Sequence, residues 1–100
     1  MRRHNDNPEA RLEKKLCELV QGHGGLCYKW VSPNDPGAPA RIVIAPGGRT
    51  IFVELKAEIG RLQKIQKWQH GRLASHGVEI RTLKGLDQVK AFVEEVFPPQ

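Results

Sequence analysis

The residues best placed to do chemistry in this 100-residue chain are a glutamate and a lysine two positions apart. Glu54 and Lys56 end a predicted strand over residues 50–56. Because side chains alternate along a strand, both lie on one face while Leu55 enters the core. The carboxylate can hold a hard cation such as Mg²⁺. The lysine can orient a water and stabilise charge developing at a phosphodiester. An exposed edge strand would also carry such a pair, so the spacing alone leaves both interpretations open.

Two other positions place polar groups where they need an explanation. Gln66 falls beside the apolar stripe of a predicted helix. An amide there must find hydrogen bonds or it costs about 1–3 kcal/mol, so it is either functional or a satisfied core glutamine. Glu9 and Glu13 are spaced i, i+4 on the first predicted helix and share one side. Their basic neighbours make a solvated charged face the simpler interpretation.

Several other chemistries are excluded. Gly47-Gly48 is followed by no helix and no Gly-Lys-Ser/Thr, so it is a turn and not a phosphate-binding loop. The four histidines and two cysteines lack the spacing of a zinc site. No apolar run reaches the length of a membrane-spanning helix and no signal core follows the first residues, so we expect a cytoplasmic protein. Cys17 and Cys27 would stay reduced there.

The elements that must position these residues follow from hydrophobic periodicity and from glycine and proline breaks. Helical patterns begin at Pro8, after Gly60 and after the last strand, and strand patterns cover residues 26–31, 41–45, 50–56 and 78–83. The order α-β-β-β-α-β-α predicts an α/β fold with a mixed four-stranded sheet flanked by helices, the second helix crossing between strands three and four. We expect one domain over residues 9–97, with flexible ends at residues 1–8 and 98–100.

Positive charge gathers in one part of the sequence. Residues 56–84 hold seven basic and two acidic side chains, which equals the net charge of the whole chain, +5. A localised excess is the expected footprint of phosphate contacts, and it predicts a DNA partner. The candidate DNA-binding residues are Lys29, Arg41, Arg49, Arg61, Lys64, Lys67 and Arg72. Trp30 and Trp68 could stack on a base, cover a subunit interface or complete the core.

Taken in order, these motifs resemble the VRR-NUC family of the PD-(D/E)xK nuclease superfamily, from about residue 9 to residue 96. The motifs are Gly24-Gly25, Lys29-Trp30-x-Ser32-Pro33, Gly37-x-Pro39-x-Arg41-Ile42-Val43, Gly47-Gly48-Arg49, Phe52-Val53-Glu54-Leu55-Lys56, Gln66 and Gly77-x-Glu79. The resemblance implies a restriction-endonuclease-like fold. It also implies an endonuclease, dependent on Mg²⁺ or Mn²⁺, that hydrolyses phosphodiester bonds in branched or junction DNA.

The resemblance assigns roles to particular residues. The implied catalytic side chains are Glu54, Lys56, Gln66 and Glu13. Of these, Glu54 and Glu13 would hold the metal together with the backbone carbonyl of Leu55, and Glu9 is the alternative to Glu13. Lys56 would be the catalytic lysine, and Gln66 would lie close to the scissile phosphate. Cutting two strands needs two such sites, so we expect a homodimer.

One position departs from the family pattern. Where the family reads Gly-x-Pro-Asp-Arg, this chain has Ala40 in place of the metal-binding aspartate. A methyl group cannot ligate Mg²⁺, so the chain would be inactive or crippled. It is then either an engineered Asp→Ala variant of an active nuclease or a natural member that binds DNA without cutting it. The other catalytic residues are still present, which favours the first. The rival function is a non-catalytic nucleic-acid-binding module.

Overall fold

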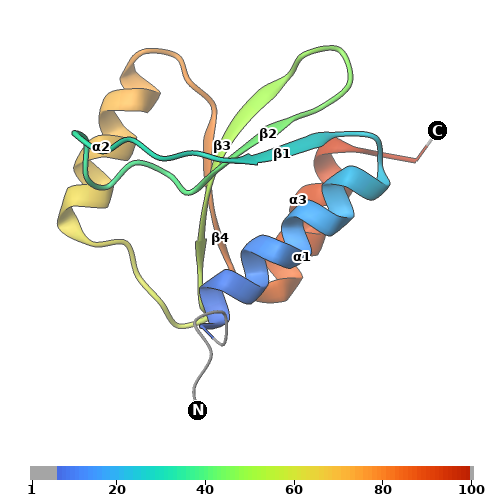
Figure 1. Cartoon of the computed structure of the whole chain (residues 1–100), viewed down its shortest axis with the longest axis horizontal. Helices are drawn as coiled ribbons and strands as arrows, with labels where there is room; N and C mark the ends of the chain where they lie inside the picture. Colours follow the sequence, from blue (N-terminus) through green and yellow to red (C-terminus); the bar gives the residue numbers. More distant parts are fainter. Residues whose placement is uncertain (1–6, 100) are drawn as a thin grey trace.

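The computed structural model describes residues 7–99, which form a four-stranded sheet between two layers of helix (Figure 1). Helices α1 and α3 lie together on one side of the sheet and α2 lies on the other. The elements are α1 (Pro8–Gly22), β1 (Leu26–Lys29), β2 (Arg41–Ile44), β3 (Thr50–Lys56), α2 (Lys64–Ser75), β4 (Ile80–Lys84) and α3 (Gly85–Val96). This order confirms the predicted α-β-β-β-α-β-α arrangement.

The sheet is mixed, as predicted. Its strands run in the order β1-β2-β3-β4, with β1, β2 and β3 antiparallel and β4 parallel to β3. Parallel neighbours need a crossover connection, and α2 supplies it. The predicted bounds of β3 match those observed, whereas β1 ends two residues earlier than expected and α2 begins only at Lys64. β3 is therefore an internal strand, paired on both sides.

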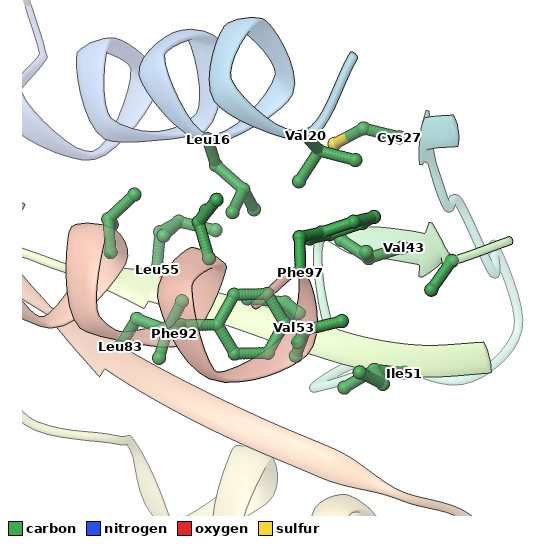
Figure 2. Close-up of a cluster of buried hydrophobic side chains, with 14 residues drawn as sticks. Leu16, Val20, Cys27, Val43, Ile51, Val53, Leu55, Leu83, Phe92 and Phe97 are labelled. Carbon is green, nitrogen blue, oxygen red and sulfur yellow. The ribbon is translucent and has the colours of Figure 1, made fainter. Parts of the chain in front are cut away.

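A single apolar core fills the space between the sheet and the α1–α3 pair. Leu16 and Val20 of α1 are fully buried, and so are Ile51 and Val53 of β3. Figure 2 shows these side chains meeting between the helices and the strands. Since alternate residues of β3 supply the core, the intervening residues of this strand face α2. The fold thus assigns one face of β3 to stability and leaves the other for different chemistry.

The structure describes only part of the two end segments for which the sequence predicts flexibility. Residues 1–6 and 100 lie outside the described residues. Asn7, however, caps α1 by accepting a hydrogen bond from the Glu9 backbone N–H at 2.7 Å, and Pro8 occupies the first helical turn. Within residues 7–99, no helix is long and apolar enough to cross a bilayer. A cytoplasmic location stays a prediction.

The expectation of two reduced cysteines is wrong for this structure. Cys17 of α1 and Cys27 of β1 are joined in a disulfide, with their Cα atoms 5.2 Å apart. Such a separation is ordinary for a bridge, and it arises because α1 packs directly on β1. The cysteines' spacing along the chain carried no sign of this contact, which depends on how the helix docks.

Candidate active site

Glu54 and Lys56 lie at the carboxyl end of β3, on the face turned away from the core. Their exposed fractions are 7% and 8%, while Leu55 between them is 1% exposed and belongs to the core. The predicted alternation is therefore confirmed. The competing interpretation, an exposed pair on an edge strand, is wrong because β3 is internal and both side chains are buried. Burying a carboxylate and an ammonium together is expensive unless they interact.

Several charged groups act on Glu54. Burial is the main cause that raises the pKa of this carboxyl, and the charges of Glu13 and Glu9 raise it further. The ammonium of Lys56 and a hydrogen bond from the backbone N–H of Ala40 act on the pKa in the opposite direction. Because Coulombic interactions weaken with distance, the groups that shift this pKa must lie near the Glu54 carboxylate. Helix α1 and the segment that leads into β2 are therefore both close to the end of β3.

Glu13 joins α1 to the first two strands. Its side chain is 16% exposed, and its Oε1 accepts a hydrogen bond from Arg41 Nε at 2.9 Å. Lys29 Nζ lies 3.7 Å from the same oxygen. Two of the predicted DNA-binding residues are thus paired with a carboxylate near Glu54. The structure brings both Glu13 and Glu9 toward the site, and the choice between them stays a prediction.

The loop before β2 is held against α2 at Gly37. Gly37 has a φ of +89°, and a Cβ there would lie 2.6 Å from the Ile65 carbonyl oxygen and 3.0 Å from the Gln66 backbone nitrogen. Only glycine permits both this backbone conformation and this approach. Three residues later, the Ala40 carbonyl accepts a hydrogen bond from the Trp30 N–H at 2.9 Å. The loop that contains Ala40 is therefore held by two contacts, one with α2 at Gly37 and one with the backbone of Trp30.

The donor set present does not fit a resident divalent cation. Ala40 offers no side-chain oxygen beside Glu54, and Glu13 is already paired with Arg41 and Lys29. Between residues 7 and 99, no three His, Cys, Asp or Glu side chains lie close enough together to hold a metal ion. Hard cations in proteins depend on several oxygen ligands. The Glu54, Leu55 carbonyl and Glu13 set expected from the resemblance therefore lacks a ligand at position 40.

Gln66 serves the beginning of α2. Its Oε1 accepts a hydrogen bond from the Gln63 backbone N–H at 2.9 Å, the reciprocal contact of a capping box. The side chain is half-buried and satisfied locally. Its amide is therefore satisfied, as the alternative to a functional role requires, but at the helix start and not in the core; the role beside a scissile phosphate stays a prediction.

Helix α2 presents two buried polar side chains that sequence reasoning did not select. Gln69 and His70 are 8% and 7% exposed. Burial is the main cause that lowers the pKa of His70, and the charge of Lys56 lowers it further, whereas a hydrogen bond with the Gly37 backbone raises it. Its Nε2 is buried and has no hydrogen-bond partner among the described residues. The sequence carries one signal for His70, because it follows Gln66 by one helical turn and so shares its side of the helix. A search for zinc-ligand spacing does not detect this signal.

The basic residues other than Lys29 and Arg41 separate into two groups. Those that precede or lie on α2 are exposed, namely Arg61, Lys64, Lys67 and Arg72. The guanidinium of Arg72 lies 4.8 Å from the ring centre of Trp68. Arg49 lies at the opposite end of β3, about 20 Å from Lys56 at strand spacing, and donates two hydrogen bonds to Glu79 at 3.1 and 2.8 Å. The structure does not bring Arg49 to the site.

This chain is similar to a curated protein and to a solved structure. "Putative nuclease p44" of Acyrthosiphon pisum secondary endosymbiont phage 1 is 39% identical over 79 residues, covering 79% of this chain and 85% of that protein. A solved structure described as a VRR_NUC domain is 31% identical, covers 87% of this chain and 95% of its own, and has a TM-score of 0.81. No family model matches the chain.

Proposed function

The chain belongs to the VRR-NUC family of nuclease domains, and we propose that it acts on branched or otherwise structured DNA by phosphodiester hydrolysis. The observation that supports this proposal is the buried Glu54–Lys56 pair at the carboxyl end of β3. Lys56 would orient the attacking water and stabilise the charge that develops on the phosphoryl oxygens. The exposed basic residues of α2 would hold the flanking phosphates.

We propose that Ala40 leaves this hydrolytic centre incomplete. Arg41 pairs with Val53 in the β2–β3 register, which places Ala40 opposite Glu54, so an aspartate at this position would add a second carboxylate beside the first. Two carboxylates and the Leu55 carbonyl make an oxygen set of the kind that Mg²⁺ or Mn²⁺ uses. The chain with alanine would bind its DNA and cut it poorly or not at all.

The test is restoration of the aspartate. The Ala40→Asp variant should bind Mn²⁺ in calorimetry, which the chain with alanine should not, and should cut junction DNA when Mg²⁺ or Mn²⁺ is added. Lys56→Ala in the same background should abolish cleavage. Asn34→Asp adds the same charge in the same loop and should give no cleavage, which controls for charge alone. An Ala40→Asp protein that is folded, binds DNA and remains inactive would refute the endonuclease proposal.

The alternative function is a DNA-binding module without catalysis. Ala40 itself favours it, together with the lack of a metal-binding cluster within residues 7–99. The two functions separate on the Ala40→Asp variant, because a pure binding module gains nothing from a restored ligand. In both cases DNA affinity should fall as salt rises, since phosphate contacts release counterions.

We also propose that the domain works as a homodimer. One chain carries one Glu54–Lys56 pair, and cutting both strands of a symmetric junction needs two. Light scattering behind a sizing column, with and without junction DNA, measures the mass directly. A single-chain mass in both conditions would contradict the dimer.

A further inference from the structure

A cavity that the proposed hydrolysis does not use lies between α2 and the loop before β2. Its volume is about 290 Å³, at the small end of the range for ligand sites. The residues that line it are Trp30, Ser32, Asp35, Ala38, Gln69, Arg72, Leu73 and His76. It is therefore walled by an indole and a leucine and edged by hydroxyl, carboxylate, amide and guanidinium groups.

The cavity adjoins the Glu54–Lys56 pair along two segments of the chain. Trp30 lines the cavity and packs on Phe52, which lies two residues before Glu54 on the same face of β3. Gln69 immediately precedes His70, whose lowered pKa is due in part to the charge of Lys56. Successive Cα atoms are about 3.8 Å apart, so the cavity starts within one or two residues of the site. A nucleotide next to the scissile phosphate could reach it.

The lining combines an aromatic wall with Asp35 and Arg72 of opposite charge, and it suits a flat molecule that can donate hydrogen bonds. Ser32 Oγ donates to Asp35 Oδ2 at 2.9 Å, which occupies one carboxylate oxygen and leaves Oδ1 for another donor. This carboxylate would repel a phosphate inside the cavity. Trp30 is held with its ring centre 4.7 Å from that of Phe52 and offers an aromatic wall. Gln69, only 8% exposed, adds an amide that both donates and accepts.

We propose that this cavity binds one unpaired nucleobase of the DNA strand, favouring bases with an exocyclic amino group. Asp35 Oδ1 would accept from that amino group, as carboxylates do from cytosine N4. The guanidinium of Arg72 would remain at the mouth of the cavity, where it faces the sugar-phosphate backbone of the DNA. Taking a base out of a duplex costs energy that an already unpaired base does not require. The inference rests on the proposed function and extends it by giving a reason why branched DNA is preferred to intact duplex.

The experiment measures binding of the chain as it exists, by fluorescence anisotropy, to forked DNA whose unpaired arm is varied at one nucleotide. Cytosine, thymine and an abasic residue are compared, each placed one to three nucleotides from the branch. At the best position, cytosine should bind about 5- to 100-fold tighter than the abasic residue, the range typical of one stacked base. Thymine lacks the amino group and should bind several-fold more weakly than cytosine.

Two variants test the assignment. Asp35→Asn keeps an oxygen for Ser32 but turns the remaining acceptor into a donor, so it should abolish the advantage of cytosine over thymine. Asn34→Ala, an exposed neighbour outside the cavity, should retain it. Equal affinity for all three forks would overturn the base-binding proposal while leaving salt-dependent DNA binding, and with it the proposed function, intact. An unchanged cytosine preference in Asp35→Asn would overturn the role of Asp35 and with it the cavity as the base's site. If no fork binds at any salt concentration, both proposals fail.

Discussion

Replacing Gly37 by alanine tests whether the loop before β2 is fixed by its contact with α2. The new Cβ would meet backbone atoms of Ile65 and Gln66 at 2.6 to 3.0 Å, and these atoms cannot rotate away. The backbone strain of a side chain at positive φ costs about 1–2 kcal/mol, and forcing extra volume into packed structure adds about 1–3 kcal/mol. We therefore expect a loss of about 2–5 kcal/mol in the free energy of unfolding.

The matched control is Gly47→Ala. Gly47 has a similar φ, +93°, but no atom lies within 4 Å of the position that the new methyl group would take. Only the strain should remain, so this variant should lose about 1–2 kcal/mol in urea unfolding. A second measurement is the His70 pKa, followed by NMR. In Gly37→Ala the loss of burial, which is the largest cause of the low His70 pKa, should raise that pKa more than the loss of the Gly37 backbone contact lowers it, so the pKa should rise toward the ordinary value; it should stay low in Gly47→Ala. Equal stability losses and an unmoved His70 pKa would refute the packing argument.

Three further outcomes follow from the charges and the crosslink. Lys67→Ala should reduce the slope of log DNA affinity against log salt concentration by about one. Arg49→Ala should leave this slope unchanged, because its guanidinium is paired with Glu79. Equal changes in slope for the two variants in filter binding would contradict the distinction between free and paired basic residues. Arg49 holds the pKa of Glu79 below its usual range, so the stability that this ion pair contributes is lost as the pH falls below about 4. In urea unfolding, Glu79→Gln should lose less stability on acidification than the unchanged protein. Reducing the disulfide should cost about 3 kcal/mol by loop entropy, and a Cys17→Ser protein should not respond to dithiothreitol.

Much of the fold could be predicted because local patterns and long-range packing agree. The alternation over residues 50–56 located β3 and assigned Leu55 to the core. The bounds of α2 were less predictable, since capping by Gln63 and Gln66 decides where the helix starts. The disulfide could not be predicted because it depends on docking between a helix and a strand.

The site was predictable only where chemistry and chain position coincide. Glu54 and Lys56 could be chosen because a strand places them together. His70 could not be chosen, because its significance comes from the Gly37 loop and from Lys56, which are distant in sequence. Arg49 was selected on charge alone, and its pairing with Glu79 depends on strand register at the far end of β3. Charge counts locate a basic segment, but they do not say which of its members are already neutralised.

The two faces of β3 show where this chain departs from the arrangement that would be most stable. On one face, Ile51, Val53 and Leu55 pack with helices as a sheet core should. On the other, Glu54 and Lys56 are buried with His70 nearby, although an unpartnered buried nitrogen such as His70 Nε2 costs about 1–3 kcal/mol. Apolar side chains at these positions would make the contact with α2 more stable. Such local inconsistency is characteristic of functional sites, and it occurs at the end of β3 beside Ala40. The fold therefore keeps polar groups at the end of β3 at a cost in stability, and under the proposed function the side chain at position 40 decides whether they can support hydrolysis.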